Sequence, residues 1–429
     1  MDRPSRPMPE RRLRPPMGWN SWDCYGTTVT EQEVLANAEF MSTRLLPHGW
    51  DTVVVDIQWY EPTARAHGYN AGAPLVLDGH GRQLPAENRF PSAAGGAGFG
   101  PLADRVHALG LRFGLHIMRG IPRRAVAARL PVAGTSFTAD EIADTASVCP
   151  WNSDNYGLNH DHPGAQAYYD AQVAQFAAWG VDFVKADDML FPYHEREIAA
   201  YARALRRSGR PIELSLSPGT EVSLAHLGHL RAHATMWRVC DDLWDRWEDV
   251  EAQFARMARW APWQGEGGWA DADMLPLGRI GIRAERGEDR LSRLTRPEQI
   301  SLLTLWIISR SPLMMGGDLP TSPAETIGLL TNDEALSVLR QGTEAREVLR
   351  EDGLVLWTAR DNEEEHTRYA AVFSLAATPR HLAVPLGSVG ARPGDRIREL
   401  WTHTDIPHDG RHLTLDLPAH GAALYRLTP

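Results

Sequence analysis

Lysine is almost absent from this sequence, because Lys185 is the sole lysine among 44 Lys and Arg residues. A chain that otherwise uses Arg for its cations suggests that this position needs a compact ammonium rather than a planar guanidinium. Cysteine is also scarce. Cys24, Cys149 and Cys240 are odd in number, far apart and without metal-ligand spacing, so they predict a reducing, cytoplasmic setting.

Long apolar runs and basic runs are missing as well. No stretch is apolar enough to span a bilayer, and the Arg- and Pro-rich start of the chain has no core of signal-peptide length. The net charge of −11 argues against nucleic acid and acidic membrane surfaces as partners. The 429 residues, 43% hydrophobic and 23% charged, are typical of a globular protein with room for two domains.

One short segment, residues 181–186, organises the candidate chemistry. It is apolar and β-branched and follows a helical segment that stops at Gly180, so it predicts a buried parallel strand. Alternate side chains of a strand share a face, so Phe183, Lys185 and Asp187 point the same way. A lysine and an aspartate therefore stand side by side at the carboxyl end of this strand.

Similar strands alternate with helical segments along most of the chain, and the last of those helices is expected at residues 324–330. Eight strand candidates are found, and seven are clearly separated by helical segments. The candidates are residues 15–22, 52–59, 111–118, 181–186, 212–217, 235–242, the turn-rich 267–275, and 312–315. Residues 61–100 and the stretch around 149–152 are expected to be long loops. This pattern predicts a (β/α)₈ TIM barrel over residues 15–338 after a disordered leader, residues 1–14.

From about Gln341 onward, the sequence consists of short runs in which apolar and polar residues alternate. Turn sequences such as Asp352-Gly353 and Asp409-Gly410 separate these runs. Residues 339–429 are therefore predicted to form a small C-terminal antiparallel β-sandwich domain, which carries no candidate catalytic residue.

Polar and indole side chains lie where the predicted barrel strands end, which is where barrel active sites form. They are Trp19, Asp56, His116, Lys185, Asp187, Arg238, Asp242, Asp271 and Asp273. On the sixth strand the alternation aims Arg238 and Asp242 into the same mouth as Lys185 and Asp187. Two carboxylates across a mouth suit glycoside cleavage, in which one attacks the anomeric carbon and the other protonates the leaving oxygen, about 5–5.5 Å apart in a retaining enzyme.

Neighbouring charges predict how these two carboxylates divide the work. Lys185 beside Asp187 should keep Asp187 ionised, as a nucleophile requires. The adjacent Asp241 and Asp245 would favour a proton on Asp242 if their charges lie close. Tryptophans at strand ends, such as Trp19, offer flat apolar faces for a sugar ring.

Six motifs in register resemble glycoside hydrolase family 27, the α-galactosidases and α-N-acetylgalactosaminidases. They are Pro16-Met17-Gly18-Trp19-Asn20-Ser21-Trp22, Val55-Asp56 with Trp59, Trp179-Gly180-Val181-Asp182 leading to Lys185-x-Asp187, Trp237-Arg238-x-x-x-Asp242, Trp269-x-Asp271-x-Asp273-Met274-Leu275, and Arg310-Ser311-Pro312-Leu313. The resemblance implies a retaining, exo-acting α-glycosidase that hydrolyses terminal sugars, with Asp187 as nucleophile and Asp242 as acid/base. The resemblance also implies that the enzyme uses no cofactor and no metal. The candidate substrate-binding residues are Trp19, Asp56, Ile57, His116, Lys185, Arg238 and Asp273.

The sequence departs from that family at four places. Ile57 stands where a second Asp is usual, residues 215–219 replace a Glu-Trp pair, His116 stands where Tyr is usual, and Asp188 replaces Asn or Gly. An apolar Ile removes an acceptor that a sugar hydroxyl would need. The main prediction is an α-galactosidase-type enzyme. The alternative is the same chemistry on an isomaltose-type α-glucoside, a β-L-arabinopyranoside or a 6-deoxy sugar.

Two further classes of protein compete with this interpretation. The acids Asp187, Asp188, Asp241, Asp242, Asp271 and Asp273 could hold a divalent metal in a barrel mouth, with Lys185 as base. Lys185 and Arg238 among these acids oppose a cation. A sugar-binding barrel without activity would not need both carboxylates. A small carbohydrate is therefore the predicted ligand, and homo-oligomer formation is left open.

Overall fold

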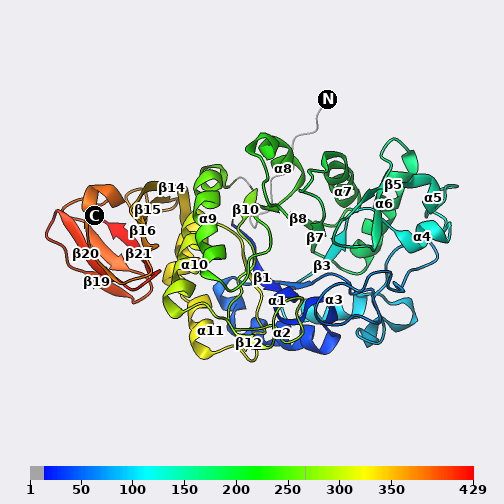
Figure 1. Cartoon of the computed structure of the whole chain (residues 1–429), viewed down its shortest axis with the longest axis horizontal. Coiled ribbons are helices and arrows are strands. Elements are labelled where there is room, and N and C mark those ends of the chain that lie inside the picture. Colours follow the sequence, from blue (N-terminus) through cyan, green and yellow to red (C-terminus); the bar gives the residue numbers. More distant parts are fainter. Residues whose placement is uncertain (1–13, 266) are drawn as a thin grey trace.

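The computed structural model describes residues 14–265 and 267–429, so nearly all of the predicted leader, residues 1–14, lies outside the described residues. Eight parallel strands form one sheet in the order β10-β9-β8-β7-β3-β2-β1-β13. Their bounds are β1 (Met17–Asn20), β2 (Thr52–Val55), β3 (Arg112–Met118), β7 (Phe183–Asp187), β8 (Glu213–Leu216), β9 (Met236–Arg238), β10 (Trp269–Asp271) and β13 (Leu313–Met315). Figure 1 shows this sheet in the right-hand body of the molecule, with the C-terminal strands at the left.

The sheet closes on itself just after β10. Leu275 bridges Met315 of β13 in parallel, its N–H donates to the Met314 carbonyl at 2.8 Å, and its carbonyl accepts from Gly316 N–H at 3.0 Å. With helices outside the strands, this closed parallel sheet confirms the predicted TIM-barrel fold class.

The helices around the barrel largely match the predicted ones. Their bounds are α2 (Glu31–Arg44), α3 (Gly100–Ala108), α6 (Pro163–Ala178), α7 (Glu195–Arg207), α8 (Leu227–His233), α9 (Trp247–Trp260), α10 (Arg296–Ser309), α11 (Ala324–Leu330) and α12 (Asp333–Gln341). The expectation that α11 is the last helix was wrong. Asn332 caps α12 by accepting from Ala335 N–H at 3.1 Å, and Leu336, Val338 and Leu339 bury its apolar side.

The segment between β3 and α6 is structured, whereas a long loop was expected there. It holds β4 (Ile121–Pro122), α4 (Arg123–Ala127), α5 (Ala139–Ile142), β5 (Ala143–Val148) and β6 (Asn155–Leu158). These three strands form a separate antiparallel sheet in the order β4-β6-β5. Strand β5 is mostly exposed and has no alternation of apolar and polar residues, so its sequence carried no strand pattern.

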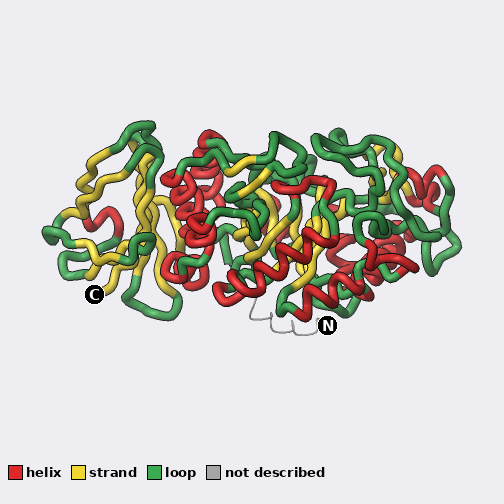
Figure 2. The backbone as a smooth tube through the Cα atoms, turned by 90° about the horizontal axis from the view of Figure 1, so that it is seen from below, coloured by secondary structure: helices red, strands yellow, loops and turns green. Residues whose placement is uncertain are grey.

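The C-terminal part is the predicted antiparallel β domain. A six-stranded sheet, β14-β15-β16-β21-β18-β19, accompanies a two-stranded sheet, β17-β20. The bounds are β14 (Gly342–Glu351), β15 (Leu354–Asp361), β16 (Arg368–Ser374), β17 (Arg380–Pro385), β18 (Arg396–Glu399), β19 (Thr404–Ile406), β20 (His412–Leu417) and β21 (Ala422–Thr428). Figure 2 shows these strands, in yellow, as a layer beside the barrel helices. Trp401 Nε1 joins the two parts by donating to Thr304 Oγ1 on α10 at 2.9 Å.

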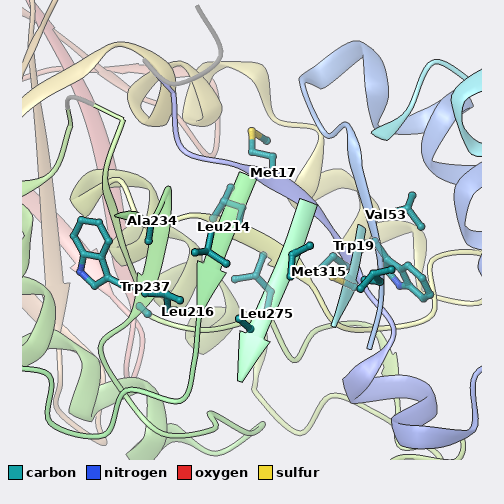
Figure 3. Close-up of a cluster of buried hydrophobic side chains, with 14 of the residues drawn as sticks. Met17, Trp19, Val53, Leu214, Leu216, Ala234, Trp237, Leu275 and Met315 are labelled. Atoms are coloured by element: carbon teal, nitrogen blue, oxygen red, sulfur yellow. The ribbon is translucent and has the colours of Figure 1, made fainter. Parts of the chain in front are cut away.

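Apolar side chains fill both the shell between strands and helices and the barrel interior. The shell includes Trp19, Trp237 and Leu275 (Figure 3). The interior includes Val54, Phe183, Met236, Trp269 and Met314. The same apolar cluster extends to residues at the carboxyl ends of the strands. No helix in the described part of the chain is long and apolar enough to cross a bilayer.

Candidate active site

The carboxyl ends of β2, β3 and β7 bring two acids and two bases together. His116 of β3 lies opposite Lys185 of β7 in the strand register. Lys185 Nζ lies 2.8 Å from Oδ2 of Asp56, which follows β2, and His116 Nε2 lies 2.9 Å from Asp187 Oδ2. The direct partner of Lys185 is thus Asp56 rather than Asp187. Asp187 has His116 on one oxygen and the Asp188 N–H, at 2.9 Å, on the other.

These contacts keep Asp187 and Asp56 ionised. Burial alone would raise the pKa of Asp187, but the His116 hydrogen bond and the positive charges of His116 and Lys185 lower its pKa below the usual value. Burial is likewise outweighed at Asp56, where Lys185 holds the pKa well below its usual range. The expected ionised state of Asp187 is therefore supported, with His116 as a contributor that the sequence did not reveal.

A second cluster gathers around Arg238 at the end of β9. Its Nη2 atom lies 2.6 Å from Asp273 Oδ2 and 3.2 Å from Asp242 Oδ1. Strand β9 ends at Arg238, four residues before the predicted end, so Asp242 comes from the following loop. The Asp242 side chain is 37% exposed whereas that of Asp273 is 5% exposed, so Asp242 is the carboxylate of this cluster that a ligand can reach.

Asp245, the other acid near Asp242 in the sequence, has a cation partner of its own from another loop. Its carboxylate is buried and accepts from Arg290 Nε at 2.9 Å, from Arg290 Nη2 at 2.6 Å and from the Arg293 N–H at 2.9 Å. The opposite charge of Arg290 therefore balances its negative charge. Asp241 is exposed and accepts from the Asp242 N–H at 2.9 Å. The sequence could not show which cation each acid meets.

An apolar wall lines the mouth around Ile57. Strand β2 ends at Val55, and the chain turns at Gln58, whose φ of 63° is left-handed, so strand alternation no longer governs Ile57. Ile57 is 1% exposed and belongs to the interior apolar cluster together with Trp22. Trp22 stacks on Tyr69 at a centroid distance of 5.8 Å, and Tyr69 packs against Trp151 at 5.3 Å.

Trp19 does not take part in this wall, contrary to expectation. It is fully buried in the shell between strands and helices, and its Nε1 donates to the Gly317 carbonyl at 2.9 Å. Trp22, three residues on, is the indole of the first strand region that reaches the mouth. Tyr69 and Trp151 come from long connections, where no sequence pattern marked them.

Asp23 is a further mouth residue that the sequence did not reveal. It is 3% exposed, and its Oδ2 has no hydrogen-bond partner among the described residues. Burial raises its pKa well above the usual value, and the charges of Asp273, Asp242 and Asp56 act in the same direction against that of Lys185. Asp23 therefore lies among the charged residues of both clusters as a carboxyl that favours its neutral form.

Asp188 is a buried acid directly after the carboxyl end of β7. Its Oδ2 lies 2.8 Å from Arg119 Nε, and its side chain is 2% exposed. Burial raises the pKa of Asp188 to about 6, and the charge of Asp187 adds to this effect whereas Arg119 opposes it.

The raised pKa of Asp188 predicts a pH-dependent cost in stability. An unfolded Asp ionises near pH 4, whereas folded Asp188 keeps its proton to about pH 6, so ionisation in the fold costs free energy that sets in between these values. The quantity to compare is the difference between the free energy of unfolding of the wild type and that of Asp188→Asn. We expect this difference to fall by up to about 3 kcal/mol from pH 4 to pH 6 and then to stay level. Chemical denaturation of both proteins at several pH values measures this difference. A difference for Asp188→Asn that does not change with pH would contradict the assignment.

The acids of the mouth are arranged around cations rather than as a metal site. In the described ranges, no group of three or more His, Cys, Asp or Glu side chains is placed to hold a metal ion. Asp271 is buried and its Oδ1 accepts from the Asp273 N–H at 2.9 Å, while Asp56 and Asp273 are paired with Lys185 and Arg238. A paired carboxylate already has its counter-charge, which disfavours a cation there.

An ionised Asp at the end of one barrel strand, an Arg-bound, reachable Asp in the same mouth and an apolar aromatic wall form the arrangement expected of a glycoside hydrolase. Comparison with known proteins agrees. Residues 152–341 match the family described as alpha galactosidase A, and residues 351–427 match the alpha galactosidase C-terminal beta sandwich domain. The chain belongs to glycoside hydrolase family 27, and it is a retaining glycosidase.

The similar proteins differ in their sugar. The crystal structure of a family 27 β-L-arabinopyranosidase from Geobacillus stearothermophilus shares 49% identity, covers 97% of each chain and has a TM-score of 0.94. A variant of that enzyme, equally similar, was crystallised in complex with arabinose. The α-galactosidase of Oryza sativa subsp. japonica is 26% identical over 426 residues, which span 97% of this chain and 85% of the rice protein.

Proposed function

We propose that this enzyme removes terminal β-L-arabinopyranosyl groups, with α-galactosides as poorer substrates. β-L-Arabinopyranose has the ring configuration of α-D-galactopyranose but has no hydroxymethyl group on the ring. The position of Ile57 in the apolar wall of the mouth carries the proposal. The 49% identity to a β-L-arabinopyranosidase supports this alternative over the main prediction, an α-galactosidase-type enzyme.

The physical argument concerns one hydroxyl. The α-galactosidase pattern places a carboxylate where this chain has Ile57, and a carboxylate can accept a hydrogen bond from a sugar hydroxyl. Ile57 is buried against Trp22 and offers only methyl and methylene groups. A sugar hydroxyl facing it loses water without gaining a partner, which costs about 1–3 kcal/mol. A pentopyranose avoids that cost because it has no hydroxymethyl group, whereas an α-glucoside keeps one. A 6-deoxy sugar still has to fit its methyl group.

The proposed reaction is a double displacement. Asp187 attacks the anomeric carbon and forms a glycosyl ester while the bond to the leaving oxygen breaks and Asp242 gives that oxygen its proton. Asp242 then takes a proton from water, the water oxygen attacks the anomeric carbon, and Asp187 leaves as a carboxylate. Two inversions give net retention of configuration.

The other residues of the mouth bind and orient. Asp56 and Lys185, held together at 2.8 Å, offer an acceptor and a donor to ring hydroxyls, while His116 fixes the Asp187 carboxylate. Arg238 bridges Asp242 and Asp273, so it sets the position of the proposed acid/base. The apolar wall of Trp22, Tyr69 and Trp151 packs against the carbon face of the sugar.

Ile57→Asp tests this proposal. The new carboxylate can accept the bond of a galactose hydroxymethyl, so the ratio of kcat/KM for an aryl α-D-galactopyranoside to that for the aryl β-L-arabinopyranoside should rise about ten- to a hundredfold. Ile57→Val keeps the wall apolar and is the matched control, which should leave the ratio near the wild-type value. Thermal unfolding of both variants shows whether the buried substitution is tolerated. An unchanged ratio in a folded Ile57→Asp enzyme would place Ile57 outside the glycon site.

A further inference from the structure

A small pocket lies beside the mouth, between the loop after β9 and the loop that leads to α10. Its volume is about 220 Å³, and we refer to it as the arginine pocket. It is lined by Trp244, Asp245, Arg246, Arg286, Gly287, Arg290 and Arg293. Four guanidinium groups and a single carboxylate therefore surround it, in a chain whose net charge is −11.

Some of these cations are already paired. Arg290 binds Asp245 through Nε and Nη2, and Arg246 binds Asp249 through Nε at 3.1 Å and Nη2 at 2.6 Å. Arg286 contacts Glu285 through Nε at 3.2 Å. These pairs neutralise three of the four guanidinium groups, so the excess positive charge of the pocket rests on the fourth, Arg293.

Arg293 supplies guanidinium donors that no side chain of the described residues uses. Within the described residues, the Arg293 guanidinium makes no hydrogen bond or ion pair with another side chain, although its backbone N–H anchors it to Asp245. Trp244 lines the pocket and is 5% exposed, but its indole Nε1 is buried, so this residue offers the pocket its ring rather than a donor. Arg286 lies over the Trp244 ring at 5.9 Å, so a second guanidinium lines the pocket beside Arg293. Two guanidinium groups that line one pocket, one of them without a side-chain partner among the described residues, suit an oxyanion.

The arginine pocket adjoins the proposed acid/base. Trp244 and Asp245 belong to the same short loop as Asp242. Glu285, the partner of Arg286, is close enough to Asp242 to feel its charge. Burial raises the pKa of Glu285, Arg286 opposes this, and the charge of Asp242 adds to it. In a retaining glycosidase the leaving group departs on the acid/base side. The pocket is therefore placed to meet the part of the substrate beyond the cleaved bond.

The geometry points to an acidic leaving group: the arginine pocket binds a carboxylate or phosphate on the aglycon of the substrate. This inference rests on the proposed function, because it takes Asp242 as the acid/base that faces the aglycon. The shared chemistry is an oxyanion held by the guanidinium groups of Arg293 and Arg286. A uronic acid residue and a phosphorylated sugar are its two sources.

The test compares two substrates that differ in one charge, the 4-carboxyphenyl β-L-arabinopyranoside and its methyl ester. The ratio of kcat/KM, acid over ester, should fall about two- to fivefold in Arg293→Gln and in Arg286→Gln, as expected for a partly exposed ion pair. Added salt should lower the wild-type ratio, and Arg293→Lys should keep part of it because the charge remains. Arg279→Gln removes a surface partner of Asp289 from the same loop, outside the pocket, and should leave the ratio unchanged.

Inhibition by glucuronate and by inorganic phosphate distinguishes the two sources. Whichever anion competes more strongly with the acidic substrate, and loses its effect in Arg293→Gln, identifies the group that the pocket selects. An acid-to-ester ratio that is the same in the wild type, Arg293→Gln and Arg286→Gln, with no competition by either anion, would overturn the inference. Hydrolysis of the ester tests the proposed glycon separately. If the ester is not hydrolysed, the same comparison on the matching α-D-galactopyranosides still tests the pocket.

Discussion

Replacing Asp187 with Asn should lower kcat on an aryl β-L-arabinopyranoside by about 10⁴-fold or more, because an amide oxygen is too weak a nucleophile to form the glycosyl ester. The side chain keeps its shape and its contact with the Asp188 N–H, so the fold should persist. Circular dichroism and thermal unfolding check the fold, and initial rates check the activity.

A smaller side chain at position 187 gives a second test of Asp187 as the nucleophile. Asp187→Gly opens room for external azide beside the anomeric carbon. Azide should restore activity and give the α-L-arabinopyranosyl azide, whose configuration is inverted, because a single displacement replaces the double one. Asp104→Gly, at an exposed position, controls for loss of an aspartate elsewhere and should not respond to azide. An Asp187→Asn enzyme that works within about tenfold of the wild type would rule out Asp187 as the nucleophile.

Replacing Asp242 with Ala should separate substrates by their leaving groups. An activated phenol departs with little protonation, so its kcat/KM should fall only about tenfold, whereas a glycoside with a sugar leaving group should lose about 10³-fold. Asp242 is the reachable acid of the Arg238 cluster, which places it to protonate the leaving oxygen.

The neighbouring Asp241→Ala is the matched control for Asp242→Ala, because Asp241 is exposed and its one hydrogen bond among the described residues is with the Asp242 backbone N–H. Asp241→Ala should slow both kinds of substrate by similar, small factors. If Asp242→Ala instead slows activated and unactivated substrates equally, the acid/base is another residue, and Asp241 is the next candidate.

The residues on strand ends could be predicted because strand geometry is local. The period of two places Lys185 and Asp187 on one face, and parallel strands bring their carboxyl ends to one edge. That was enough to gather Asp56, His116 and Lys185 in one mouth, as the structure shows. Six motifs in register gave the family.

The partners of each charge and the loops could not be predicted, because they depend on contacts between distant segments. Lys185 pairs with Asp56, which lies 129 residues away in the sequence, and Asp245 pairs with Arg290 of another loop. Trp19 and Trp22 looked equivalent in the sequence. Because the strand ends at Asn20, Trp19 lies in the shell between strands and helices, whereas Trp22 lies at the mouth. Asp23 is distinctive only through its burial, which no local pattern reveals.

The position of Ile57 shows how a strand end decides specificity. Strict alternation would have turned Ile57 away from the mouth, but β2 ends at Val55 and the turn at Gln58 redirects the chain. The departure from the family pattern was visible in the sequence. Its consequence for the sugar depended on where a strand ends, which sequence patterns locate poorly.

The most direct measurement of the central claim is the ratio of kcat/KM for the wild-type enzyme on p-nitrophenyl β-L-arabinopyranoside and on p-nitrophenyl α-D-galactopyranoside, with the first-formed sugar followed by NMR. We predict that the arabinopyranoside is preferred by about tenfold or more and that β-L-arabinopyranose appears first. A preference for the galactoside, or release of the α-anomer of arabinose first, would contradict the account.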